Sequence, residues 1–176
     1  MALLESDTIL LRALEPEDLS LLYKWENNSA WWHVGNTINP YSKYILREYI
    51  VNSDKTIYEN KQLRLMITLK SGRETIGMID LFDYEHHYRR VGVGVLIDPS
   101  FQNQGFAFDA FQLLIPYCFD FLDIHTLYAH VLPENKSSIT LFEKLGFEKT
   151  GQLKDWIRKE NKYSDVFVYQ LIRDGK

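Results

Sequence analysis

Apolar and polar positions alternate along some stretches of the chain and recur at helical spacing along others. Alternation, or a short run rich in Val, Ile and Leu, predicts a strand, and apolar positions three and four apart predict a helix. This reading gives the order β-α-α-β-β-β-α-β-α-β-β. Strands are expected at 8–14, 63–69, 75–84, 91–97, 126–132, 147–157 and 164–172, and helices at 15–28, 36–53, 104–121 and 135–145.

Individual residues support several of the predicted helix ends. Pro16 suits the first turn of the first helix, and Ser42 is an expected N-cap of the second. Pro116 is expected to kink or shorten the third helix, because proline lacks an N–H for the helical ladder. Gly146 is expected to end the last helix. These elements are expected to pack as a mostly antiparallel sheet with helices on its faces. We expect a single α+β domain over residues 1–176.

Composition narrows the class of protein. The chain has 176 residues, a net charge of −4 and 45% hydrophobic residues. It has no long Lys/Arg run, so we expect neither nucleic acid nor a membrane as partner. The N-terminus lacks the pattern of a signal peptide, and Cys118 is the one cysteine. A cytoplasmic location is the expectation from these features.

Phe101–Phe111, "FQNQGFAFDAF", contains the most informative glycine. A predicted strand runs into this loop, and the loop opens onto a predicted helix. The first N–H groups of a helix have no intrahelical acceptor and bind anions readily. Gly105 permits close approach of a ligand to the backbone, and Gln102 and Gln104 are neutral donors for phosphate oxygens. The physics indicates a phosphate or pyrophosphate site, and a plain tight turn is the alternative.

This stretch resembles motif A of the GNAT superfamily of acyl-CoA-dependent N-acyltransferases, Gln/Arg-x-x-Gly-x-Gly/Ala, at Gln102, Gly105 and Ala107. Asn135, Ser138 and the "EKLGF" of 143–147 resemble the second signature of the family. The closing hairpin resembles the RimJ/RimL-like branch, which includes ribosomal-protein N-terminal acetyltransferases and relatives of spermidine acetyltransferase. The resemblance covers about residues 10–171. It implies a three-layer α/β/α fold with a splayed, mixed, mostly antiparallel sheet and helices on both faces.

The resemblance also implies a site. Acetyl-CoA is expected as co-substrate, without a metal, its pyrophosphate on the amides from Gln104 to Phe108. The expected cofactor-binding residues are Leu96, Ile97, Gln102, Asn103, Gln104, Gly105, Phe106, Ala107, Phe108, Asn135, Ser138 and Phe142. Asn103 stands where the family usually has Gly, and Asn tolerates the left-handed backbone better than most residues. The resemblance also allows a homodimer.

Two glycines in the strand "VGVGV" have two readings. Gly92 and Gly94 either mark the place where the strand backbone meets the pantetheine arm, which we favour, or make room for a neighbouring aromatic ring.

Acetylation of an amine needs a base, because an alkyl ammonium has a pKa of about 10.4. Many members of the GNAT superfamily have a Glu early in the strand that corresponds to residues 91–97 of this chain. This chain has no acidic residue in that strand. Asp80 and Asp83 are the expected candidates, and their spacing predicts side chains on opposite faces, with Tyr84 on the face of Asp80. His130 is interpreted as a structural histidine. His86 and His87 lack a third ligand, which argues against a metal site.

Protonation of the departing thiolate is the least demanding step, because a thiolate is only modestly basic. The polyamine branch uses a Tyr where Phe142 stands here, and Phe cannot donate a proton. The resemblance to the ribosomal-protein branch, where the position of Ser138 has this role, implies Ser138 as the donor. Cys118 is interpreted as a buried, inert thiol.

The acceptor is the least determined part of the prediction. The expected substrate-binding residues are Trp31, Trp32, Asp80 and Tyr84. The two tryptophans either hold an ammonium by cation–π attraction or cover the helices. The absence of acids from 29–42 argues against a long polyamine. A small-molecule amine and a protein N-terminus both stay open. The two function classes are an acetyl-CoA-dependent N-acetyltransferase acting through a ternary complex and a coenzyme A-binding module with little turnover.

Overall fold

The computed structural model describes residues 4–32, 37–159 and 161–174. Its strands form one mixed sheet in the order β1-β2-β3-β4-β5-β7-β6. The strands are β1 (Ile9–Arg12), β2 (Leu63–Leu69), β3 (Thr75–Glu85), β4 (Arg90–Ile97), β5 (Thr126–Val131), β6 (Glu148–Lys159) and β7 (Lys162–Ile172). The helices are α1 (Leu19–Glu26), α3 (Lys43–Val51), α4 (Ile57–Asn60), α5 (Phe106–Pro116) and α6 (Lys136–Lys144).

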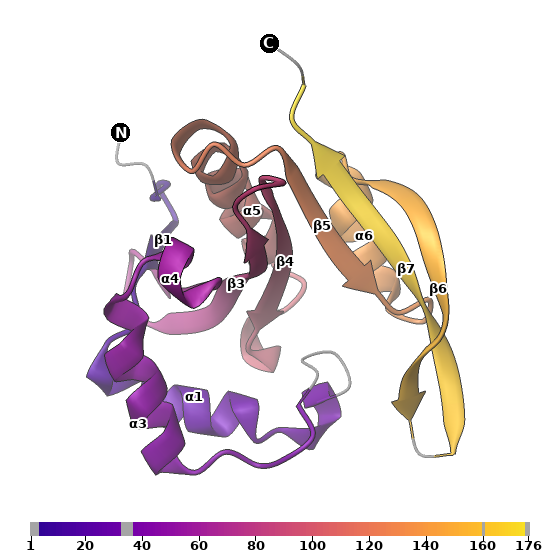
Figure 1. The fold of residues 1–176 in the computed structure, drawn as a ribbon. Helices are drawn as coiled ribbons and strands as arrows, with labels where there is room; N and C mark the ends of the chain where they lie inside the picture. The colour runs from indigo at the N-terminus through magenta and orange to yellow at the C-terminus, as the bar shows by residue number, and fades with distance from the viewer. Residues whose placement is uncertain (1–3, 33–36, 160, 175–176) are drawn as a thin grey trace.

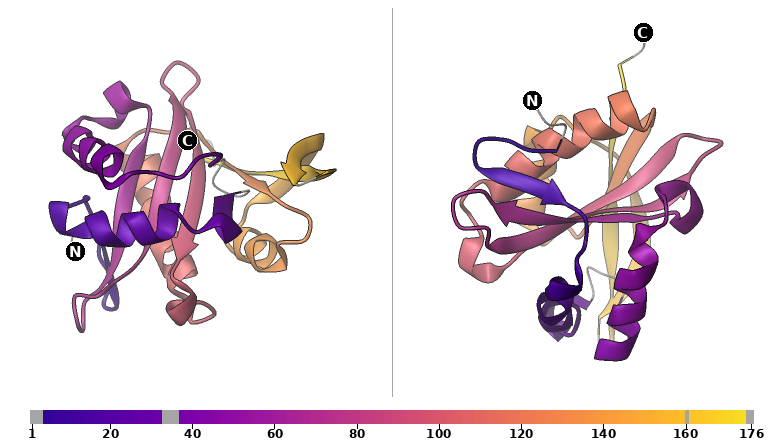
Figure 2. Two further views of the ribbon diagram at one scale, coloured as in Figure 1. Left: turned by 90° about the horizontal axis from the view of Figure 1, so that it is seen from below. Right: turned by 90° about the vertical axis from the view of Figure 1, so that its left-hand side faces the viewer.

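The sheet lies between two layers of helix. In Figure 2, α1 and α3 lie on one face of β1–β4 and α5 lies on the other. Figure 1 shows α6 behind β5 and β7, on the side of α5. The burial follows this division, since the larger apolar cluster includes residues of α5 and α6 and the smaller one residues of α1 and α3. The predicted three-layer α+β architecture is confirmed.

One strand pair differs from all the others. β4 and β5 run parallel, and their register covers only Arg90–Gly92 against Thr126–Tyr128. Every other neighbouring pair in the sheet is antiparallel. Beyond Gly92 the two strands diverge, and Figure 1 shows the sheet opening there as a V. The splay expected from the family resemblance is therefore present.

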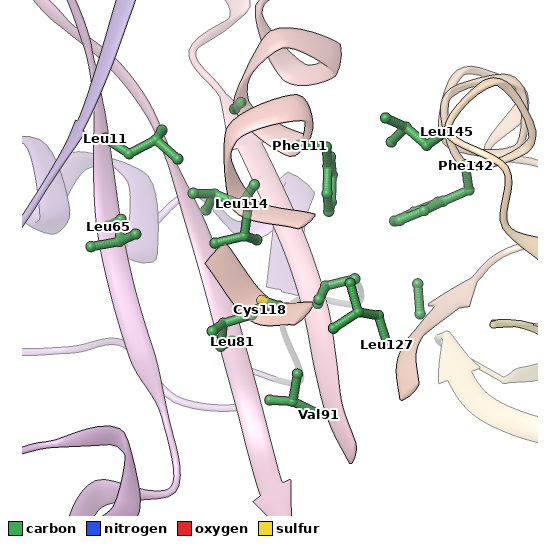
Figure 3. Packing of buried hydrophobic residues seen from close by; sticks show 14 of the residues in the cluster. Leu11, Leu65, Leu81, Val91, Phe111, Leu114, Cys118, Leu127, Phe142 and Leu145 are labelled. Carbon is green, nitrogen blue, oxygen red and sulfur yellow. The ribbon is translucent and has the colours of Figure 1, made fainter. Parts of the chain in front are cut away.

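Aromatic rings join the two helices behind this V. Phe111 of α5 and Phe142 of α6 face one another in Figure 3, with ring centroids 5.4 Å apart. Phe142 also contacts Phe147 and lies parallel to Tyr169. Burying each such ring contributes about 1.5–3 kcal/mol, so the cluster fixes the position of α6 relative to α5.

The structure adds one short helix to the predicted elements and shows how the third predicted helix ends. α4 was not predicted, although Thr56 and Glu59 have the spacing of a capping box, and the Thr56 N–H donates to Glu59 Oε2 at 3.0 Å. At Pro116 the regular helix ends, and a π-helical segment follows over Tyr117–Phe121. Pro116 thus shortens the helix as expected.

Candidate functional site

The loop between β4 and α5 is shaped by two residues in the left-handed region. Asn103 has φ 61° and Gly105 has φ 91°. Asn103 therefore adopts the conformation that the sequence analysis expected of it. A Cβ at Gly105 would meet no atom within 4 Å, so this glycine serves the backbone turn and leaves open space in front of α5.

The two glutamine side chains of this loop bind the loop itself. Gln102 Nε2 donates to the Ile97 carbonyl at 2.9 Å, and Gln104 Nε2 donates to the Ser100 carbonyl at 3.3 Å. These bonds brace the loop, whereas the sequence analysis expected both amides to face a phosphate.

Backbone donors are the groups that the loop presents at the start of α5. The bond from the Asp109 N–H to the Gly105 carbonyl, 3.0 Å, is the first turn of the helical ladder. The N–H groups of Phe106, Ala107 and Phe108 precede that turn and have no acceptor within the helix. Together with the helix dipole they suit an anion.

The V between β4 and β5 leads to this helix start. Figure 1 shows α5 and α6 both beginning at the open end of the V. Val93–Ile97 lie beyond the last residue pair of β4 and β5. On the side that faces β5, their backbone N–H and C=O groups are therefore not paired with another strand among the described residues. Ile97 is buried in the larger cluster, and Leu96 packs against the smaller one. Free backbone groups of this kind can bind an amide-containing chain as an extra strand would.

The two strand glycines differ in their contacts with a neighbouring aromatic ring. A Cβ at Gly92 would lie 2.2 Å from the Phe82 ring, and one at Gly94 would lie 3.7 Å from it. Phe82 of β3 therefore lies over β4 at Gly92 and reaches Tyr128 of β5, with ring centroids 6.1 Å apart. Of the two interpretations of these glycines, room for a neighbouring aromatic ring is correct for Gly92.

Asp80 is held in a partly buried ion pair. Its two oxygens accept from Nε and Nη2 of Arg64 at 2.7 and 2.8 Å, and Arg64 also pairs with Glu26 of α1. The guanidinium lies over the Tyr49 ring, 5.4 Å from its centroid. Burial lowers the pKa of Arg64, but Asp80, Tyr49 and Glu26 outweigh it and hold that pKa well above its ordinary value. Each oxygen of Asp80 thus accepts a hydrogen bond from a permanent cation.

A β-bulge alters the rest of β3. The register with β4 shifts between Phe82 and Glu85, and Asp83 has φ 51°. Tyr84 consequently belongs to the larger cluster, donating to or accepting from His86 Nδ1 at 3.1 Å, whereas Asp80 faces α1. The prediction that Asp80 and Tyr84 share a face is wrong, because the bulge shifts the alternation by one residue.

The same bulge changes the surroundings of Asp83. This exposed carboxylate acts electrostatically on Tyr128 and His130 of β5. That Asp80 and Asp83 point to opposite faces of the strand stays a prediction.

The start of α6 brings Asn135 and Ser138 together. Asn135 Oδ1 accepts from the Ser138 N–H at 3.2 Å and from Ser137 Oγ at 2.9 Å. Asn135 is therefore the N-cap, and the half-buried Ser138 hydroxyl has no hydrogen bond to any residue that the structure describes. Phe142 is 4% exposed and belongs to the aromatic cluster behind the V.

The tryptophans near the acceptor side have packing roles. Trp25 is buried and donates from Nε1 to Asp98 at 3.0 Å, and Trp31 packs against the smaller cluster. Trp32 Nε1 donates to the Glu26 carbonyl at 2.8 Å. Residues 33–36, which follow them, lie outside the described residues.

The last features to consider are the cysteine thiol, a metal site and a membrane-spanning helix. Burial raises the pKa of the Cys118 thiol to about 12, so this thiol is inert as expected. Within 4–32, 37–159 and 161–174, no group of His, Cys, Asp and Glu could hold a metal ion. No helix in these ranges is long and apolar enough to cross a membrane.

Comparison with known proteins decides the family. The model of the acetyltransferase (GNAT) domain matches residues 8–148. The chain is a GNAT acetyltransferase. It is 30% identical to spermidine N(1)-acetyltransferase of Escherichia coli strain K12, over 96% of this chain and 91% of that protein. It is 29% identical to the Vibrio cholerae enzyme of the same name, over 90% and 89% of the two chains.

A solved structure agrees with this assignment. The crystal structure of spermidine N-acetyltransferase from Vibrio cholerae in complex with CoA and spermine superposes with a TM-score of 0.84. It is 27% identical and covers 95% of this chain and 96% of that one. The GNAT chain described here is thus an N-acetyltransferase that transfers acetyl to an amine, and its relatives do not favour a binding module without turnover.

Proposed function

We propose that this acetyltransferase binds acetyl-CoA in the V between β4 and β5 and acetylates a primary amine of a small molecule. The observation that carries the proposal is the short β4–β5 register, which ends at Gly92 and leaves the backbone of Val93–Ile97 free beside the start of α5. The amides of Phe106, Ala107 and Phe108 would receive the pyrophosphate. The pantetheine arm would run along Leu96 and Ile97 into the V.

A backbone N–H of β4 would stabilise the oxygen of the thioester as it becomes negative, in a place where water is excluded. The amine nitrogen attacks the thioester carbon, a C–N bond forms and the C–S bond breaks. Coenzyme A leaves with the electron pair of that bond. Ser138 is the proposed proton donor to this thiolate, because its hydroxyl is not used as a helix cap. Asn135 would hold the start of α6 in place.

The charges on the acceptor face favour a compact amine. Arg64 neutralises much of the charge of Asp80 and Glu26, the acids of β3 and α1 on that face. Asp83 is the remaining carboxylate, and its charge raises the pKa of Tyr128 and opposes the lowering of the pKa of His130. A polyamine carries several ammonium groups and would need more uncompensated acids than this. The names of the curated relatives support a small amine over a protein N-terminus as acceptor.

An amine panel with detection of released thiol tests the proposal. Monoamines, diamines, spermidine and spermine are each supplied with acetyl-CoA, and a peptide with a free N-terminus serves as comparison. We expect acetyl-CoA-dependent thiol release with at least one small amine and faster turnover with a compact amine than with spermine. Turnover on the peptide alone would contradict the proposed acceptor class. Absence of thiol release with every acceptor would contradict turnover itself.

A further inference from the structure

His130 lies on the acceptor face of the V. On β5, Leu127, Ala129 and Val131 are buried in the larger cluster beside α5 and α6. Tyr128 and His130 alternate with them and therefore project from the opposite face. The β4–β5 register ends at Tyr128, so His130 is the next side chain on that face where the strands have diverged.

The neighbours of His130 leave its imidazole accessible. Its ring lies 5.6 Å from the ring of Tyr128, which in turn contacts Phe82. In the β5–β7 register His130 is paired with Val168 of β7, whose side chain cannot bind a proton. The side chain is exposed and makes no hydrogen bond to any residue that the structure describes. One ring nitrogen is thus available to a ligand in the V.

The charges around His130 favour a neutral ring. Among the described residues, Asp83 of β3 is the charged group that acts on it, and Tyr128 is the titratable neighbour on its own strand. Desolvation lowers the pKa of His130, and Asp83 raises it by less, so the pKa lies below its ordinary value. A neutral imidazole at neutral pH accepts a proton, and Asp83 then stabilises the imidazolium.

We propose that His130 is the general base that takes the proton from the acceptor ammonium. The inference deepens the function proposed above and rests on it. The ammonium gives one proton to a ring nitrogen of His130, directly or through one water, and the free amine then attacks the thioester carbon. The Ser138 hydroxyl gives its proton to the leaving thiolate and takes in return the second proton of the new C–N centre, and His130 returns its proton to solvent. The products are the acetamide, the thiol of coenzyme A and one released proton.

Asp80 and the β4 position beside Tyr128 are less suited to this step. Both oxygens of Asp80 accept from Arg64, so a proton would have to displace a bidentate ion pair. Gly92 occupies the β4 position beside Tyr128 and carries no side chain, and Phe82 fills the space above it. His130 has an unoccupied lone pair at the point where the strands part.

The test compares His130→Gln with His125→Gln. His125 is also exposed and lies just before β5, where its backbone N–H donates to the Arg89 carbonyl. With the amine identified by the panel, kcat is measured from pH 6 to pH 10, and acetyl-CoA affinity is measured by calorimetry. We expect His130→Gln to lower kcat at neutral pH about 100-fold and to bind acetyl-CoA as the wild type does.

The pH profile separates a base from a structural residue. Activity of His130→Gln is expected to recover towards pH 10, where more of the amine is already free, and added imidazole is expected to restore part of the rate of His130→Ala. His125→Gln is expected to keep the wild-type profile. A His130→Gln enzyme with wild-type kcat at pH 7 would overturn the base while leaving the acetyltransferase intact. Loss of acetyl-CoA binding in that variant would overturn it too, and an inactive wild type would overturn both proposals.

Discussion

At the scale of residues, the chemistry depends on which polar groups are left unpaired. Asn135 caps α6 and thereby leaves the Ser138 hydroxyl available, whereas Arg64 occupies both oxygens of Asp80. Sequence identified Asn135, Ser138 and Asp80 as candidates from motif and strand position. It did not reveal the Arg64 pair, because Arg64 and Asp80 meet through the β2–β3 register and not through any local spacing.

A matched pair of serines tests the thiol step. Ser138→Ala is expected to lower kcat about tenfold or more while raising KM little, because a proton donor acts only as the thiolate leaves. Ser137→Ala removes a neighbouring hydroxyl that donates to Asn135 and is expected to keep near wild-type kcat. Steady-state kinetics on both variants measures this difference. Equal kinetics in the two variants would assign Ser138 no part in the reaction.

At the scale of elements, periodicity predicted most helices and strands because each has one apolar face. The exceptions have local causes. α4 is too short for a periodic pattern, and the bulge at Asp83 shifts the alternation that placed Tyr84 beside Asp80. Gly92 was assigned to the cofactor because sequence cannot show that the ring of Phe82 lies above it.

One buried carboxylate joins two elements of the site. Asp98, at the start of the loop before α5, accepts from Lys24 Nζ at 2.8 Å and from Trp25 Nε1 at 3.0 Å, both on α1. It also accepts from the Ser100 N–H at 3.1 Å. The bond from Lys24 is the main cause that lowers the pKa of Asp98 well below its ordinary range. Asp98 therefore couples the acceptor-side helix to the anion-binding loop.

Asp98→Asn is expected to destabilise the protein at pH 7 by about 2 kcal/mol, because charged hydrogen bonds are replaced by weaker ones. The folded pKa of Asp98 is depressed, so its stabilisation is complete above the unfolded pKa of about 4 and is lost as pH falls below it. Urea unfolding at pH 7 and pH 3 should show a difference between wild type and variant that shrinks in acid. The exposed Asp7→Asn is the control. A difference that stays constant with pH would contradict the role of the Asp98 charge.

At the scale of the whole molecule, a single parallel strand pair organises the site. The splay of β4 from β5, the left-handed loop and the starts of α5 and α6 meet at one end of the sheet (Figure 1). Sequence motifs predicted this arrangement through the family resemblance, since alternation alone does not say where two strands part. A homodimer, a cytoplasmic location and the absence of a metal stay predictions.

In the proposed complex, the loop at Gly105 binds the pyrophosphate of acetyl-CoA. Calorimetry and thermal unfolding of Gly105→Val, with Gly146→Ala as control, test it most directly. Both glycines have a left-handed φ, 91° and 87°, so both variants carry backbone strain of about 1–2 kcal/mol. At a hundredfold excess of acetyl-CoA over its Kd, wild type and Gly146→Ala should gain about 2.7 kcal/mol. Gly105→Val should fold and gain nothing. An unchanged acetyl-CoA affinity in folded Gly105→Val would contradict the account.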